Sequence, residues 1–251
     1  MTPPHQEPPR SNRARSVPNP SSSTWGLGDV AAGILAAQVL SILVVGVVFA
    51  ATNWSDTAEI PLWATGLLQV PLWCGLAGSV LYAARAKGNG VVAEFGLAGR
   101  VWDAPLGLAL GTLCQLVVLP LLYWPVLSLL GRSTEDLAEP AEDLASRADG
   151  NAGWLLLALM VVVAAPLVEE LFYRGLLLGA LRKRGWGPWP AIIVSSAVFG
   201  AMHFQPLQFL GLFTFGVVLA LLRTWQGRLG GAIWAHVGFN ATTVVSLYLQ
   251  A

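Results

Sequence analysis

Two adjacent carboxylates and one arginine interrupt a long apolar segment of the chain. The stretch "PLVEELFYRG", residues 166–175, lies inside "WLLLALMVVVAAPLVEELFYRGLLLGAL", residues 154–181. Ionisable side chains inside such a segment cost several kcal/mol unless a partner neutralises them or a function uses them. Glu169, Glu170 and Arg174 are therefore the first candidates for chemistry.

The spacing of these three residues separates a paired carboxylate from an unpaired one. Glu170 and Arg174 are four residues apart, so they share one face of a helix, in the order that favours an ion pair. Glu169 points about 100° away from Glu170 and has no such partner. An unpaired carboxylate screened from water can accept a proton and act as a general base. The alternative is a fully satisfied polar cluster that holds helices together.

Histidine and asparagine occur in the apolar segments that follow. Two of the three histidines lie outside the N-terminal tail: His203 in "FGAMHF", residues 199–204, and His236 in "HVGFN", residues 236–240. His236 and Asn240 are four apart and project in one direction. Each histidine alone is compatible with a hydrogen-bonded core residue, but two histidines, a spare glutamate and an amide in neighbouring segments favour one shared site.

Composition predicts that helices crossing a membrane position these residues. The 251-residue chain is 55% hydrophobic and only 11% charged, whereas soluble domains carry about 25% charged residues. We therefore expect an all-α fold, a polytopic transmembrane helical bundle with about seven spans. The expected spans are residues 27–51, 61–84, 104–130, 152–181, 187–204, 206–223 and 229–250.

The basic residues predict the orientation of this bundle. Eleven of the fourteen lysines and arginines fall on one side of a seven-span arrangement, and the opposite loops are acidic. One of these loops contains the acidic run "STEDLAEPAEDLASRADG", residues 133–150, which we expect to be a solvated loop.

Residues 1–25, rich in Pro, Ser and Arg, are expected to be a disordered cytoplasmic tail. Residues 26–103 would form N-terminal helices with an interfacial segment, and residues 104–251 the catalytic core.

Helix geometry gives a first test of a shared site. Glu169 precedes Trp186, at the turn between two spans, by 17 residues, and His203 follows it by 17. Both side chains then lie about 25 Å up the same hairpin. His236 comes only eight residues after Arg228, so the last span must be offset along the membrane normal, or the fourth must protrude, for His236 to join them.

Several classes of function have no support in the sequence. The formal net charge is zero, which suggests no nucleic-acid partner, and no phosphate-binding glycine motif indicates a nucleotide. The two cysteines, Cys74 and Cys114, lie far apart without metal-ligand spacing, and we expect two free thiols.

The three motifs together resemble a known family. "EELFYR" is similar to the EExxxR signature, "FGAMH" to FxxxH and "HVGFN" to HxxxN of the type II CAAX prenyl endopeptidases, within the CAAX protease and bacteriocin-processing family of intramembrane proteases. All three occur in the expected order between Glu169 and Asn240. The resemblance covers about residues 100–250.

The resemblance implies a role for each residue. Glu169 would be the general base that activates a water, with His203 working alongside it. His236 and Asn240 would hold the water and stabilise the oxyanion, and Glu170 and Arg174 would support the site. Hydrolysis of a peptide bond needs these types of group: a base for the water and donors for the charge on the carbonyl oxygen.

Participation of a metal stays open at this point. The family has been described both as metalloproteases and as glutamate-dependent enzymes, and Glu169, His203 and His236 are the types of ligand that bind Zn²⁺ with one open position. We prefer a site that requires no cofactor, because asparagine is a better oxyanion donor than zinc ligand and Glu169 is not expected to be both ligand and base.

We therefore expect an intramembrane endopeptidase of a bacterial plasma membrane, with its N-terminus in the cytoplasm and a membrane-anchored peptide or protein as substrate. The alternative is a non-catalytic immunity or scaffold protein of the same fold. A proton-coupled carrier would use the same glutamate, but the chain lacks a second, repeat-related half.

Overall fold

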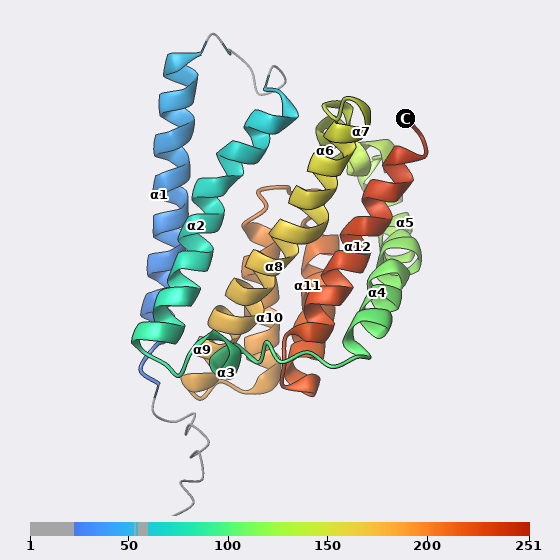
Figure 1. Cartoon of the computed structure of the whole chain (residues 1–251). Helices are drawn as coiled ribbons and strands as arrows, with labels where there is room; N and C mark the ends of the chain where they lie inside the picture. Colours follow the sequence, from blue (N-terminus) through green and yellow to red (C-terminus); the bar gives the residue numbers. More distant parts are fainter. Residues whose placement is uncertain (1–22, 53, 55–59) are drawn as a thin grey trace, which may run out of the picture.

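The computed structural model describes residues 23–52, 54 and 60–251, and the elements in these ranges are helices joined by turns (Figure 1). The expected all-α fold is confirmed. Of the expected tail, residues 1–22 lie outside the described residues. The helices are α1 (Leu27–Ala51), α2 (Leu62–Ala86), α3 (Val91–Phe95), α4 (Asp103–Leu113), α5 (Leu119–Leu130), α6 (Thr134–Ser146), α7 (Gly150–Ala158), α8 (Ala165–Glu169), α9 (Leu178–Lys183), α10 (Pro188–Ala201), α11 (Phe209–Gln226) and α12 (Gly230–Tyr248).

Three π-helical segments continue these helices: η3 (Cys114–Val118), η4 (Leu159–Ala164) and η5 (Glu170–Leu177). Each of the first two ends shortly before a proline, Pro120 or Pro166. A proline lacks the N–H of a helical bond, and its ring clashes with the carbonyl one turn earlier. The wider π turn is the local adjustment that lets residues 103–130 and 150–183 each remain one long helix.

Five helices in the described part are long and apolar enough to cross a membrane: Leu27–Ala51, Leu62–Ala86, Asp103–Leu130, Gly150–Lys183 and Phe209–Gln226. The remaining two expected spans correspond to α10, a shorter apolar helix, and to α12. The count of about seven spans and the orientation stay predictions.

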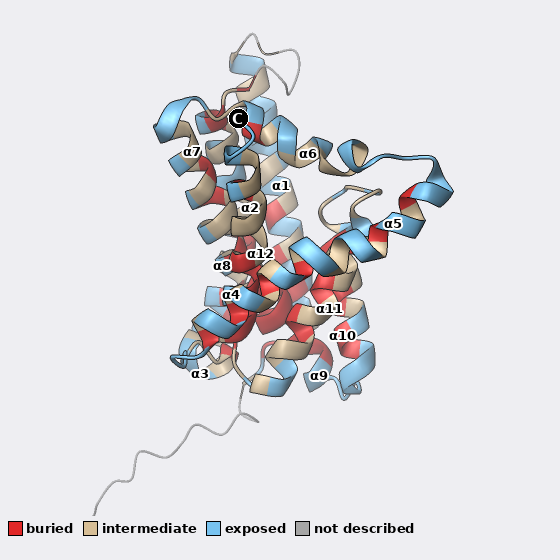
Figure 2. Ribbon diagram, turned by 90° about the vertical axis from the view of Figure 1, so that its right-hand side faces the viewer, coloured by how far each residue is buried: buried red, intermediate tan, exposed pale blue. Residues whose placement is uncertain are grey.

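The outer surface of the bundle is apolar, as a bilayer requires. Figure 2 shows exposed residues along the outer helices and buried residues concentrated around α8, α11 and α12. In α1, Leu35, Ile42 and Val47 are each more than 60% exposed. Such a surface is stable against acyl chains and unfavourable in water.

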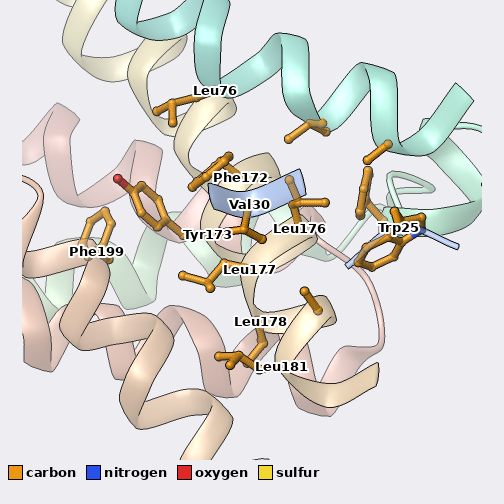
Figure 3. Close-up of a cluster of buried hydrophobic side chains, with 14 of the residues drawn as sticks. Trp25, Val30, Leu76, Phe172, Tyr173, Leu176, Leu177, Leu178, Leu181 and Phe199 are labelled. Atoms are coloured by element: carbon orange, nitrogen blue, oxygen red, sulfur yellow. The ribbon is translucent and has the colours of Figure 1, made fainter. Parts of the chain in front are cut away.

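The main hydrophobic core joins the N-terminal helices to the helix that carries the carboxylates. Val30 of α1 and Leu76 of α2 lie in one buried cluster with Phe172 and Leu176 of η5 (Figure 3). The expected N-terminal and catalytic parts of the chain therefore share a core.

The last residue of the expected tail, Trp25, is also buried in this core, so the described end of the tail is ordered. Its indole Nε1 donates a hydrogen bond of 2.8 Å to Oε2 of Glu94 in α3. Burial raises the pKa of the Glu94 carboxyl, but hydrogen bonds from Trp25 and Asn89 lower it more, and the pKa lies below its ordinary value of 4.5.

The acidic run that we expected to be a loop forms the helix α6, and that expectation is wrong. Ser133 begins the helix: its hydroxyl accepts from the backbone N–H of Asp136, and the Asp136 carboxylate accepts from the N–H of Ser133. This reciprocal capping was present in the sequence as S-x-x-D. Leu144 and Ala145 on the inner side pack in a small hydrophobic cluster, while Glu139, Glu142 and Asp143 are exposed.

Candidate functional site

The paired carboxylate expected from the sequence is present and fully buried. Arg174 Nη1 donates a 2.9 Å hydrogen bond to Glu170 Oε1, and the two side chains are 1% and 0% exposed. Arg174 Nη2 also donates to the backbone oxygen of Gly216 in α11, over 3.2 Å. The guanidinium therefore neutralises the buried carboxylate and ties two helices together.

His236 of α12 lies between the two adjacent glutamates. Its Nδ1 is 2.9 Å from Glu170 Oε1, and its Nε2 is 3.8 Å from Glu169 Oε2. The first distance is a hydrogen bond and the second is too long for one. If Nδ1 carries the proton donated to Glu170, Nε2 is left facing Glu169 as an acceptor, or as a donor when the ring is protonated.

The position of His236 resolves the offset that the sequence left open. His236 is the seventh residue of α12, whereas Glu170 lies 13 residues before the end of α9. If the end of α9 and the start of α12 were level, Glu170 and His236 would lie about 10 Å apart along the helix axes. The contact between them therefore means that α12 is displaced or tilted relative to the helix of Glu170.

Burial distinguishes Glu169 from Glu170. The side chain of Glu169 is 18% exposed, and that of Glu170 is 0% exposed. Glu170 Oε1 receives both Arg174 and His236. Glu169 has no hydrogen bond among the contacts of the described residues and remains accessible, so these neighbouring carboxylates differ in the way the sequence predicted.

His203 lies in the turn that follows α10, and its Nδ1 is 2.8 Å from the backbone oxygen of Phe199. The Phe199 ring contacts both histidines, with centroid distances of 4.8 Å to His203 and 5.8 Å to His236. The guanidinium of Arg174 also lies 4.2 Å from this ring centroid. Phe199 therefore brings His203 to the side of the site occupied by His236.

Asn240 reaches the helix of the carboxylates by a different route. Its Nδ2 donates a 2.7 Å hydrogen bond to the backbone oxygen of Val161 in η4. The N–H of Ala165 donates to Met160, and Pro166 has no N–H, so neither serves the Val161 carbonyl. Asn240 thus compensates for Pro166, and one of its two amide hydrogens is engaged in this bond.

Across residues 23–52, 54 and 60–251, no group of three or more His, Cys, Asp or Glu side chains is arranged to hold a metal ion. The Nδ1 atoms of His203 and His236 bond the backbone oxygen of Phe199 and the Glu170 carboxylate, so only Nε2 of each ring is left for another partner. Cys74 and Cys114 are free thiols, as expected.

Several contacts that connect these motifs could not be predicted from the sequence. Phe199 was identified from the sequence as the first residue of the FxxxH motif, but Gly216 and Val161 act through backbone oxygens and leave no signal in the sequence. The hydroxyl of Tyr123, isolated in an apolar span, was a visible signal. It donates to Leu207 O and accepts from the N–H of Gly211, and each of these hydrogen bonds is 2.8 Å long.

Comparison with known proteins bears on the segment that contains this site. Residues 151–242 match the sequence profile described as type II CAAX prenyl endopeptidase Rce1-like. An uncharacterized 24.3 kDa protein of Escherichia coli is 32% identical over 127 residues. That match spans 48% of this chain and 56% of the relative, so about half of the relative's length is covered. No solved structure matches significantly.

The matched segment contains all six candidate residues, from Glu169 to Asn240. It begins in α7 and ends within α12. Residues 151–242 are thus a domain of the Rce1-like type II CAAX prenyl endopeptidase family.

Proposed function

We propose that this protein is an intramembrane endopeptidase that hydrolyses a peptide bond of a membrane-associated peptide or protein with water activated by Glu169. The observation that carries the proposal is the arrangement of four charged or titratable side chains inside an apolar bundle. Arg174, Glu170 and His236 form a continuous hydrogen-bonded chain, and the imidazole at its end faces the accessible carboxylate of Glu169.

The difference in burial supports Glu169 as the general base. A base must reach both water and substrate, and Glu170 cannot do so because it is fully buried and engaged by Arg174 and His236. Glu169 is partly exposed and carries no short hydrogen bond that would hold its charge. It therefore has the access to water and substrate that proton abstraction needs.

The other groups supply orientation and donors. Glu170 fixes the ring of His236 through Nδ1, as the buried carboxylate of a hydrolase triad does, and leaves Nε2 on the side of Glu169. His203 would work alongside the base. Asn240 has a second amide hydrogen beyond the one given to Val161, and this hydrogen and His236 would stabilise the oxyanion.

The reaction balances without an additional reactant. Glu169 takes a proton from water, and the oxygen attacks the scissile carbonyl carbon. The tetrahedral intermediate collapses as the carbon–nitrogen bond breaks, and the proton held by Glu169 passes to the leaving nitrogen. The products are a carboxylic acid and an amine, and Glu169 returns to its starting state.

Membrane topology and localisation form part of the proposal. Seven spans with the N-terminus in the cytoplasm agree with the distribution of basic residues, and the relative in Escherichia coli supports a bacterial plasma membrane. The catalytic core would comprise residues 104–251, which contain the whole family domain. The substrate would be a membrane-anchored peptide or protein, and processing of a bacteriocin-type peptide is one such activity.

A cleavage assay in detergent tests the base. Purified wild type, Glu169→Gln and Glu170→Gln would be incubated with a panel of membrane-anchored peptides, and products identified by mass spectrometry. We expect Glu169→Gln to lose about 10²–10⁴-fold in rate with an unchanged thermal midpoint. If Glu169→Gln cleaves at the wild-type rate, the assignment of the base is wrong.

The same assay decides two further points. We propose a site that needs no metal, so a chelator should leave the rate unchanged, and loss of activity restored by Zn²⁺ would contradict this. If the folded wild type cleaves no member of a broad panel, the alternative of a non-catalytic immunity or scaffold protein gains support.

A further inference from the structure

Phe204, directly after His203, adopts an unusual backbone conformation. Its φ is +55°, and it is the one non-glycine residue with a positive φ among the described residues. This region is unfavourable for a bulky side chain because Cβ approaches the following carbonyl oxygen. Glycine or asparagine would end α10 at lower cost, so helix termination does not explain a phenylalanine here.

The ends of the connection between α10 and α11 hold Phe204 in this conformation. The N–H of Phe204 donates to Ala201 O over 3.1 Å. On the far side, Tyr123 bonds both Leu207 and Gly211, and Gln208 Nε2 donates to Leu137 O of α6 over 3.0 Å. The surrounding structure therefore maintains the strain, which is typical of segments that contact a ligand.

The position of this connection limits what the Phe204 ring can face. The 14 residues of α10 rise about 21 Å, less than the roughly 30 Å of a bilayer core, so the proposed seven-span topology places the connection at membrane depth. Gln208 at its end bonds Leu137 of α6, so α6 lies against it. Non-helical backbone at that depth is stable where protein covers it or where it borders water, and not against acyl chains.

Phe204 nevertheless exposes its side chain. It is 74% exposed, whereas Phe199, one turn earlier, is fully buried against both histidines. A strained and exposed aromatic residue thus directly follows the candidate catalytic His203 along the chain. The face of this ring can pack against an apolar side chain, and it offers no matching contact to a polar one.

We propose that Phe204 determines specificity by packing against a large apolar side chain of the substrate next to the scissile bond. The inference rests on the proposed peptidase function. The proposal explains the strained backbone of Phe204 by a contact with the substrate and not by a requirement of the fold.

Three substitutions separate the ring from the backbone strain. Phe204→Gly removes both, Phe204→Asn removes the ring and tolerates a positive φ, and Phe204→Leu keeps an apolar side chain and the strain. Trp124→Leu is the matched control, because Trp124 is an aromatic residue of α5 that is 78% exposed. Each variant would be assayed with N-palmitoylated peptides that carry Leu, Phe, Ser or Asp at each position around the cleavage site.

We expect Phe204→Gly and Phe204→Asn to raise the thermal midpoint while lowering kcat/KM for the preferred apolar peptide by about 10-fold or more. The loss should appear mainly in KM, and the Ser and Asp peptides should change less than about twofold. Phe204→Leu should retain most of the preference, and Trp124→Leu all of it. An unchanged ratio of apolar to polar peptides in Phe204→Gly would overturn the inference.

A binding measurement distinguishes this failure from failure of the proposed function. Glu169→Gln in nanodiscs would be titrated with the same peptides carrying a fluorophore, which reports binding without cleavage. If apolar peptides bind more weakly once Phe204→Gly is added, the inference holds even where the base assignment fails. If the Glu169→Gln protein binds no apolar peptide better than its Asp counterpart, the inference is wrong.

Discussion

The Nδ1 atom of His236 lies 2.9 Å from Oε1 of Glu170, the same oxygen that accepts a hydrogen bond from Arg174. One carboxylate oxygen thus joins α12 to the helix of residues 150–183, and Arg174 extends the connection to α11 through Gly216. Glu170 and Arg174 thus join their own helix to α12 and α11, and Nε2 of the histidine lies on the side of Glu169.

Substitution of Arg174 by methionine should destabilise the protein strongly. The Glu170 carboxylate would remain buried without its cation, which costs about 3–5 kcal/mol. Thermal or denaturant unfolding in detergent would measure the loss. The double variant Arg174→Met/Glu170→Met should recover part of it, because both charges are then absent. Arg132→Met, in the exposed pair with Asp136, is the control and should cost less than about 1 kcal/mol. Equal effects at the two sites would contradict the importance of the buried pair.

Asn240→Ala should lose the hydrogen bond to Val161 and destabilise the protein by about 0.6–1.7 kcal/mol, from the average to the largest value for such bonds in membranes. The companion substitution is Pro166→Ala, which restores a backbone N–H to the helix close to the carbonyl of Val161. In a double-mutant cycle, the Asn240→Ala loss should shrink in the Pro166→Ala background. Additive losses would mean that Asn240 does not compensate for the proline.

Gly216→Ala should disturb the site although glycine to alanine normally favours a helix. An added Cβ would lie 3.1 Å from Ser196 Cβ, 3.2 Å from Phe199 Cδ1 and 3.3 Å from Arg174 Nη2. The gain of about 0.5–1 kcal/mol from helix propensity is outweighed by crowding of about 1–3 kcal/mol. Gly46→Ala, whose Cβ would meet no atom within 4 Å, should be stabilising. A thermal midpoint raised equally by both substitutions would rule out this close packing.

Glu94 should contribute stability that depends on pH. Its pKa in the folded protein is below the ordinary value of 4.5, because hydrogen bonds from Trp25 and Asn89 outweigh the effect of burial. As the pH falls, the unfolded chain therefore protonates Glu94 at a higher pH than the folded protein does. The contribution of Glu94 to stability is complete above about pH 4.5 and is lost as the pH falls through the lower pKa of the folded protein. The stability difference between wild type and Glu94→Gln should shrink over that window. The exposed Glu142→Gln is the comparison, and a Glu94→Gln difference independent of pH would contradict the expectation.

The helical membrane fold and part of the site follow from local spacing. The four-residue interval between Glu170 and Arg174 places them on one helix face whatever the rest of the chain does, and the observed 2.9 Å contact confirms the predicted pair. The prediction that Glu169 lies outside this pair is also confirmed. The acidic segment 134–146 was predicted wrongly as a loop, because its charge was given more weight than the capping signal at Ser133.

Contacts between helices required the tertiary structure. The sequence brought His236 and Asn240 to one face of one helix, but their partners, Glu170 and Val161, depend on the offset of α12 and on the π turn before Pro166. The same holds for the exposed ring of Phe204, which lies in a connection bonded to other helices through Tyr123 and Gln208. Helix periodicity determines which side chains share a face, whereas axial shifts, tilts and loop closures determine which faces meet. Those quantities arise from packing over the whole bundle, and short sequence motifs do not contain them.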